Sequence, residues 1–268
     1  MAIVGGVLGL VLVAMLFTFR PATSSTFQEP GYPTFSLAPL TFEPLGPDGL
    51  ARAYENLGRV TIGGRSATLS LSRAEDLVLP TGRVGAGDGF FMDAEPFTVT
   101  LPPGHHPVLL LNAGDASGQS VAAAMVRTQG GNPVRWEGAH VAGDPSADPF
   151  AYGVDSGTGS FISPEAVARL KQLTADQASA VTDALLAEYK SDPATAQTAA
   201  VTIDPSTGAN VVTFTSGYGD GGYASWFGFD ADANAVALLT SFDLVDDPAR
   251  PTRSIRPGAT IQPGDSVP

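Results

Sequence analysis

Two glycine-rich segments each contain an aspartate that could serve in acid–base chemistry. Residues 154–159 read VDSGTG and residues 216–223 read SGYGDGGY, and their aspartates are Asp155 and Asp220. An apolar residue followed by Asp-Ser-Gly is typical of the catalytic turn of aspartic proteases, in which two carboxylates share one proton. The sequence has no second Asp-Thr-Gly or Asp-Ser-Gly, so this chemistry would require a second copy of the chain.

Three interpretations of these segments stay open. In the one we favour, the chain is a non-enzymatic binding or interaction module, and the two loops meet to form a surface from Asp155, Gly157, Gly219, Asp220 and Tyr223. In the second, Asp155 and Asp220 are the carboxylate pair of a hydrolase. The third is purely structural, because an aspartate in a tight turn commonly accepts hydrogen bonds from nearby backbone N–H groups.

Other groups that support catalysis or metal binding are scarce. The absence of cysteine excludes disulfides, thiolate metal sites and cysteine nucleophiles. His105 and His106 are adjacent and would point to opposite faces of a strand, and His140, the last of the three histidines, has no neighbours that complete a triad. Residues 230–234 (DADAN) begin like a calcium loop but lack its glycine and glutamate. We therefore expect no metal and no cofactor.

Charge and composition narrow the class of partner. The 268 residues include 27 acidic and 14 basic side chains, which gives a formal charge of −13. A negative surface disfavours nucleic acid as a partner, because the phosphate backbone carries the same sign. With 43% hydrophobic residues, the chain can bury a core, and a protein partner is the remaining expectation.

The elements that must position the two loops are mainly strands. Residues 211–245 predict three strands, with the glycine-rich loop between the first two and a turn at residues 230–234 before the third. Further strand patterns occur at residues 67–71, 97–101, 108–112 and 120–128. Two short late helices are predicted, one capped by Ser163 and one opened by a Thr174/Gln177 capping box. Runs of strands followed by clustered helices predict a β-rich α+β fold with mostly antiparallel sheets.

The N-terminus predicts a membrane anchor. Residues 2–19 contain no charge, and a helix of that length spans roughly 27 Å, close to the thickness of the hydrocarbon core. A cleaved signal peptide is the alternative, but no Lys or Arg precedes the apolar run. We favour a single-pass anchor and an extracytoplasmic domain.

The proline content distinguishes three segments in the rest of the chain. Residues 20–66 are rich in proline but also carry aromatic residues, which predicts a stalk that becomes a surface arm. Residues 67–245 are the predicted globular domain. Residues 246–268 hold further prolines and three arginines and are predicted to be a disordered tail.

Several segments, in this order, resemble a bacterial family known as domain of unknown function 4241. The matching segments are residues 79–88 (LPTGRVGAGD), 102–109 (PPGHHPVL), 121–127 with 134–136, 150–161 (FAYGVDSGTGSF), 216–229 (SGYGDGGYASWFGF) and 238–244. They lie within about residues 67 to 245. The resemblance implies a single β-rich domain and no particular reaction or ligand.

The chain also departs from this family pattern. Gly89 stands where a proline often follows the aspartate, and Ile162 and Ser163 replace an acidic position after VDSGTGSF. Loss of that acidic residue weakens a two-carboxylate mechanism around Asp155.

Overall fold

The structure is a computed structural model that describes residues 43–115, 118–191 and 198–249. Its strands form two sheets, and every pairing between neighbouring strands is antiparallel. The larger sheet contains β1 (Arg59–Ile62), β2 (Arg65–Leu79), β4 (Gly104–Asp115), β5 (Gly118–Arg127), β6 (Arg135–Gly138), β7 (Ala151–Val154), β11 (Gly221–Phe229) and β12 (Ala235–Ser241). The smaller sheet contains β3 (Gly85–Asp88), β8 (Thr158–Ile162), β9 (Thr198–Asp204) and β10 (Ala209–Thr215). The prediction of a β-rich, mostly antiparallel fold is confirmed.

The strand order shows how the chain alternates between the sheets. The larger sheet runs β1-β2-β4-β5-β12-β11-β6, with β7 paired to one end of β11, and the smaller runs β3-β8-β10-β9. The chain therefore crosses from the larger to the smaller sheet between β7 and β8. It crosses back between β10 and β11, so both glycine-rich segments are crossing points.

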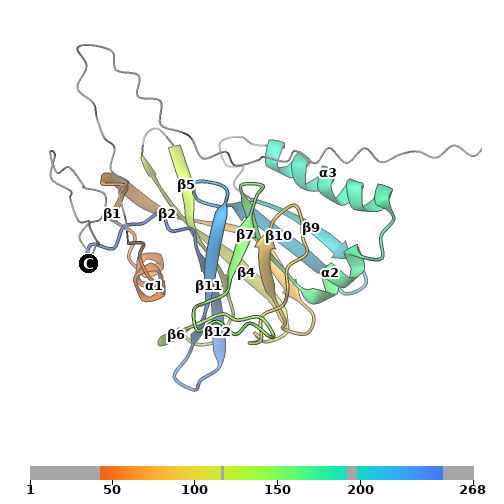
Figure 1. The fold of residues 1–268 in the computed structure, drawn as a ribbon, viewed down its shortest axis with the longest axis horizontal. Coiled ribbons are helices and arrows are strands. Elements are labelled where there is room, and N and C mark those ends of the chain that lie inside the picture. Colours follow the sequence, from red (N-terminus) through yellow and green to blue (C-terminus); the bar gives the residue numbers. More distant parts are fainter. Residues whose placement is uncertain (1–42, 116–117, 192–197, 250–268) are drawn as a thin grey trace, which may run out of the picture. The chain divides into compact units, whose positions relative to one another are not determined.

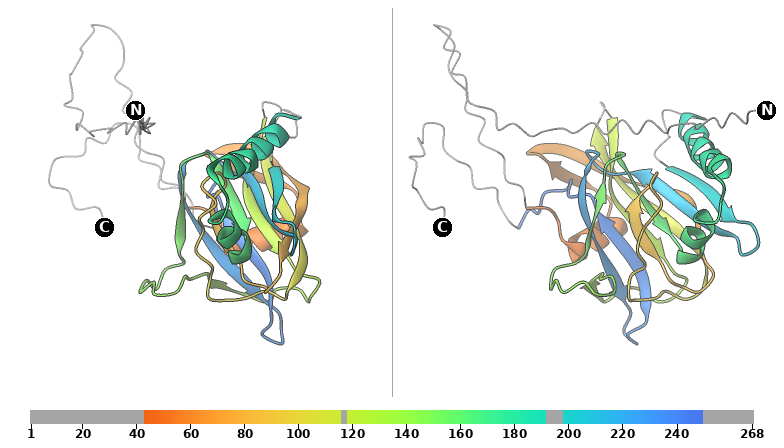
Figure 2. Two further views of the ribbon diagram at one scale, coloured as in Figure 1. Left: turned by 90° about the vertical axis from the view of Figure 1, so that its right-hand side faces the viewer. Right: turned by 45° about the vertical axis from the view of Figure 1, so that its right-hand side comes forward.

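Three helices cover the outer faces of the sheets (Figures 1 and 2). Helix α1 (Pro47–Glu55) packs on the larger sheet, and α2 (Pro164–Leu170) and α3 (Ala175–Ser191) pack on the smaller one. The main hydrophobic core lies between the two sheets. The described residues thus form four layers, in the order helix, sheet, sheet, helices.

Strand alternation explains how one strand serves two layers. In β8, Phe161 points into the core between the sheets while the next residue, Ile162, packs against the helices. In β10, Phe214 faces Phe161 with ring centroids 5.0 Å apart, while Val211 belongs to the helix side. Both strands are therefore buried on both faces, as expected for a sheet that is covered on both sides.

The predicted helix starts are confirmed at both late helices. The Ser163 hydroxyl accepts a hydrogen bond from the Ala166 N–H at 3.2 Å, which caps α2. At α3 the capping box is complete: the Thr174 N–H donates to Gln177 Oε1 at 3.0 Å, and the Gln177 N–H donates to Thr174 Oγ1 at 3.3 Å. Helix α3 has 17 residues and is longer than the short helix predicted.

Helix α1 and strand β1 lie within the segment predicted as stalk and arm. Pro47 occupies the start of α1, where its missing N–H costs nothing. Leu50 and Tyr54 are buried against the larger sheet, and the Tyr54 hydroxyl donates to the Ala123 carbonyl at 3.0 Å. High proline content therefore did not prevent this part of the chain from joining the core.

One predicted strand is wrong. Residues 97–101 form only an isolated bridge, between Phe97 and Val141. The Phe97 N–H donates to the Val84 carbonyl, but the N–H of Thr98 donates to His140 instead. The pairing with each neighbouring segment stops after a single bridge, so residues 97–101 do not form a ladder.

The predicted anchor at residues 2–19 and most of the predicted tail lie outside the described residues. Among the residues that the structure describes, no helix is both long and apolar enough to cross a membrane.

Candidate functional site

The two glycine-rich loops meet at one end of the two-sheet core. The turn of residues 155–157 joins β7 to β8, and residues 216–220 join β10 to β11; we call them together the loop pair. The Gly157 N–H donates to Asp220 Oδ1 at 3.0 Å, and the Ser216 N–H donates to the Gly157 carbonyl at 3.1 Å. Pairing of β7 with β11 continues the contact, with Val154 opposite Gly221. Gly157 and Asp220, two of the predicted site residues, are thus brought together.

Glycine is required where the loops touch. Gly157 has φ of 69° and Gly219 has φ of 110°, both in the region that side chains disfavour. A Cβ on Gly157 would lie 3.8 Å from the Gly219 Cα, so the two backbones approach closely. The glycine density that the sequence shows is therefore used to bring two loops into contact.

Tyr223 supports the loop pair from below. Its side chain is buried, and its hydroxyl lies 2.8 Å from the Gly219 carbonyl and 3.3 Å from the Ser216 carbonyl. Burial raises the pKa of Tyr223, and the nearby carboxylates of Asp243 and Asp220 raise it further. The structure places this predicted contact residue beneath the surface, where it holds the loop rather than facing a partner.

Asp88, which sequence reasoning missed, fixes the other side of the turn. It ends β3 and is only 4% exposed. Its Oδ2 accepts from the N–H groups of Asp155 (2.8 Å) and Ser156 (2.9 Å). Its Oδ1 accepts from the Ser156 hydroxyl at 2.8 Å and from the N–H groups of Phe90 (2.8 Å) and Phe91 (3.3 Å). The one available signal was its place after three small residues in GAGDG, a setting typical of an Asx turn.

These bonds keep Asp88 charged. Burial by itself would raise the pKa of Asp88, but the hydrogen bonds from Phe90, Asp155 and Ser156 outweigh it. The pKa of Asp88 therefore lies below its ordinary value, and its carboxylate is a structural charge at neutral pH.

The two predicted carboxylates do different things. Asp220 uses its carboxylate to bind the Gly157 N–H, whereas Asp155 is tied down through its backbone N–H to Asp88 and leaves its side chain exposed. Among the described residues no hydrogen bond joins the Asp155 and Asp220 carboxylates. This arrangement uses the Asp220 carboxylate to hold the turn and does not pair it with the Asp155 carboxylate.

His105 and His106 point to opposite faces of β4, as adjacent strand positions require. His105 is exposed, whereas His106 is buried, with its Nε2 2.7 Å from the Pro102 carbonyl. Within residues 43–115, 118–191 and 198–249, no group of three or more His, Asp or Glu side chains could hold a metal ion.

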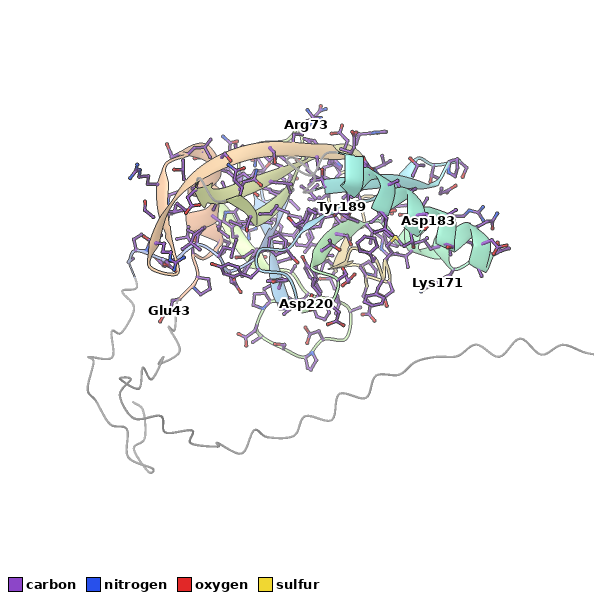
Figure 3. The ribbon with its side chains drawn as sticks, turned by 90° about the horizontal axis from the view of Figure 1, so that it is seen from above. Glu43, Arg73, Lys171, Asp183, Tyr189 and Asp220 are labelled. Carbon is purple, nitrogen blue, oxygen red and sulfur yellow. The ribbon has the colours of Figure 1, made fainter. Side chains whose placement is uncertain are left out.

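The outer side of the loop pair exposes an aromatic ring among carboxylates. Tyr218 is 78% exposed, and the exposed acidic residues Asp155 and Asp220 lie on the loop pair, while Asp243 lies in the segment after β12 that Gly217 contacts. We call these four residues the loop surface. Gly217 brings the loop against Phe242 and Leu244, which places Asp243 beside it. Figure 3 shows Asp220 well apart from Lys171 and Asp183 on the helix layer.

Comparison with known proteins identifies a family. The model of a family described as protein of unknown function (DUF4241) matches residues 77–240, which include Asp88 and both members of the loop pair. The resemblance expected from the sequence is confirmed. No curated protein and no solved structure gives a significant match to the chain.

Proposed function

The chain belongs to the DUF4241 family of proteins of unknown function, and we propose that its domain is a non-enzymatic binding module whose contact site is the loop surface. The observation that supports this is the locked loop pair, in which Gly157 bonds to Asp220 and Ser216 bonds to Gly157. A loop held by the rest of the fold loses little conformational entropy when a partner binds.

The chemistry of the loop surface indicates a basic protein segment as partner. Tyr218 offers a large, amphipathic contact area with few rotatable bonds, as aromatic residues do at binding interfaces. Asp155, Asp220 and Asp243 add exposed carboxylates on the two loops and the adjoining segment, which favour Lys or Arg side chains opposite. The same charge, together with the net −13 of the chain, disfavours nucleic acid.

Photo-crosslinking tests this proposal. A photoreactive amino acid at position 218 is expected to give a discrete adduct with a basic protein in cells that express the full chain. The matched control carries it at position 183, an exposed position on α3, and is expected to give no such adduct. In the position-218 protein, Asp155→Asn with Asp243→Asn should reduce adduct yield at least about twofold, since each charge contributes roughly 0.2–1 kcal/mol at an exposed site. Equal yields from both positions would refute the assignment.

The proposed location of the module is the outer face of a membrane, tethered by residues 2–19. The uncharged run supports this, since about 20 apolar residues suffice to span the hydrocarbon core. The full chain is expected to stay in the membrane pellet after alkaline carbonate extraction, whereas a chain lacking residues 2–19 is expected in the supernatant. N-terminal sequencing of the pelleted protein should begin at Met1 or Ala2. A soluble product starting near residues 22–25 would instead establish a cleaved signal peptide.

A further inference from the structure

Strand β6 lies at one outer edge of the larger sheet (Figure 1). It pairs with β11 on one side, and the strand order of the sheet ends with it. Among residues 43–115, 118–191 and 198–249, no other segment makes a hydrogen bond to the backbone of Trp136 or Gly138. The second side of β6 is therefore an open edge.

The register of β6 shows which backbone groups face this open side. The Ala139 N–H, one residue beyond Gly138, donates to the Ser225 carbonyl at 2.9 Å and continues the same register. Hydrogen-bonded and non-hydrogen-bonded pairs alternate along an antiparallel ladder. Trp136 and Gly138 are therefore in non-hydrogen-bonded positions toward β11, and their N–H and C=O groups point to the open side.

The end strands β1, β3 and β9 are each met by another segment of the chain. Beside β1, the Asp246 N–H donates to the Thr61 carbonyl at 2.9 Å. Beside β9, the Ala200 N–H donates to the Glu188 carboxylate at 2.8 Å, and β3 forms a bridge to Pro96. These contacts occupy bonding positions of the kind that β6 leaves open.

The side chains on either side of Trp136 carry opposite charges. Arg135 and Glu137 lie on the same face of β6 and form an ion pair, with side chains 44% and 56% exposed. The Arg135 guanidinium also lies 4.3 Å from the centre of the Phe229 ring, which holds it at the edge. Charged residues on an edge strand commonly prevent pairing. Here the two signs can be matched by a strand that presents them in the reverse order.

A second copy of β6 presents this reverse order when it lies antiparallel, with the two-fold axis at Trp136. Arg135 then lies opposite Glu137 of the second copy, and the symmetry repeats this pair. Both are non-hydrogen-bonded pairs, with Cα atoms about 4.5 Å apart, where opposite charges stabilise the sheet. Trp136 faces its counterpart as a hydrogen-bonded pair, so the outward N–H and C=O groups of both copies are used. Parallel pairing would place like charges side by side.

We propose that two copies of this domain associate through β6, by antiparallel pairing centred on Trp136 that joins their larger sheets. Val134, which is 65% exposed just before β6, then lies opposite Gly138 of the second copy, where no side chain obstructs it. A four-residue strand buries little area, so the association is weak and depends on protein concentration. This inference goes beyond the proposed function and uses none of the loop-surface residues.

Charge reversal tests this pairing in full chains, held in an excess of detergent micelles and followed by sedimentation velocity at increasing protein concentration. Arg135→Glu places two like-charged pairs across the axis, as does Glu137→Arg, and each should weaken dimerisation at least about tenfold. An equimolar mixture of the two variants restores opposite charges across the axis and should associate within about twofold of the wild type. The double variant, Arg135→Glu with Glu137→Arg, should do the same. The matched control, Arg59→Glu on β1 at the other end of the sheet, should change nothing.

The mixture separates contact between chains from effects within one chain. Each single variant also loses its own ion pair between positions 135 and 137, and mixing does not restore that pair. Failure of the mixture to recover would therefore overturn the proposal, as would a wild-type chain that stays monomeric at every concentration. Association that ignores every charge change would assign the contact to another surface and would equally overturn it. Failure to capture a basic partner at position 218 affects none of these results.

Discussion

Replacement of Asp88 by alanine is expected to lower the free energy of unfolding by about 3–5 kcal/mol, one of the largest effects of any single substitution in this domain. The carboxylate is 4% exposed and accepts hydrogen bonds from Asp155, Ser156, Phe90 and Phe91. Alanine leaves the N–H groups of Asp155 and Ser156 and the Ser156 hydroxyl, all partly buried, without their acceptor, and each loss costs roughly 1 kcal/mol or more. Urea unfolding can follow this through Trp136 and Trp226, since both tryptophans of the chain lie in the domain.

The matched control for this substitution is Asp93→Ala. Asp93 is exposed and lies five residues further along the same connection, so its loss should change stability by less than about 0.5 kcal/mol. Asp88→Asn keeps one acceptor oxygen but loses the charge, and it should fall between the wild type and Asp88→Ala. If Asp88→Ala behaved like Asp93→Ala, the buried carboxylate would not be what holds the turn.

The contribution of Asp88 should also depend on pH in a definite direction. Because the pKa of Asp88 is lowered in the folded protein, its ionised form stabilises the fold fully above the unfolded-state pKa of about 3.9. This stabilisation is lost as the pH falls through the lower, folded-state pKa. The stability gap between the wild type and Asp88→Asn should therefore be constant from pH 7 to about pH 5 and narrow towards pH 3. A gap that widens on acidification would contradict the lowered pKa.

The elements that sequence reasoning predicted well are those specified by neighbours in the chain. The turn at residues 230–234 follows from its polar residues between apolar alternations, and its Asp230 accepts from the Asn234 N–H at 2.9 Å. The Ser163 cap and the Thr174 capping box are likewise local. In each case the bonding partners lie within four residues, so spacing alone identified them.

The features that the sequence could not predict depend on contacts between residues far apart in the chain. β10 and β11 are consecutive, yet they belong to different sheets, and only the strand order reveals that the loop between them is a crossing. Asp88 and Ser156 are 68 residues apart, so no local pattern links that carboxylate to the turn it holds. Residues 97–101 alternate like a strand, but their pairing stops at an isolated bridge between Phe97 and Val141. The spacing of apolar residues shows which face of a segment is buried, but it does not show which other segment pairs with it.

Gly82→Ala is expected to destabilise the domain by more than about 3 kcal/mol, because two separate costs coincide there. Gly82 has φ of 79°, which an alanine adopts only with strain. An added Cβ would also lie 2.0 Å from the Leu101 carbonyl oxygen. That oxygen has little room to retreat, because the Leu101 N–H is itself held by the Gly82 carbonyl at 2.9 Å. The clash falls where the chain leaves β2 in the larger sheet for β3 in the smaller one.

Gly64→Ala isolates the backbone cost of Gly82→Ala from its steric cost. Gly64 has nearly the same φ, 74°, but a Cβ there would meet nothing within 4 Å. Its substitution should cost only the conformational penalty of roughly 1–2 kcal/mol, visible in the same tryptophan-monitored urea titration. The difference between the two variants measures the contact with Leu101. If both variants lost equal stability, the chain at residues 82 and 101 would be able to move apart, and the contact between Gly82 and Leu101 would not be rigid.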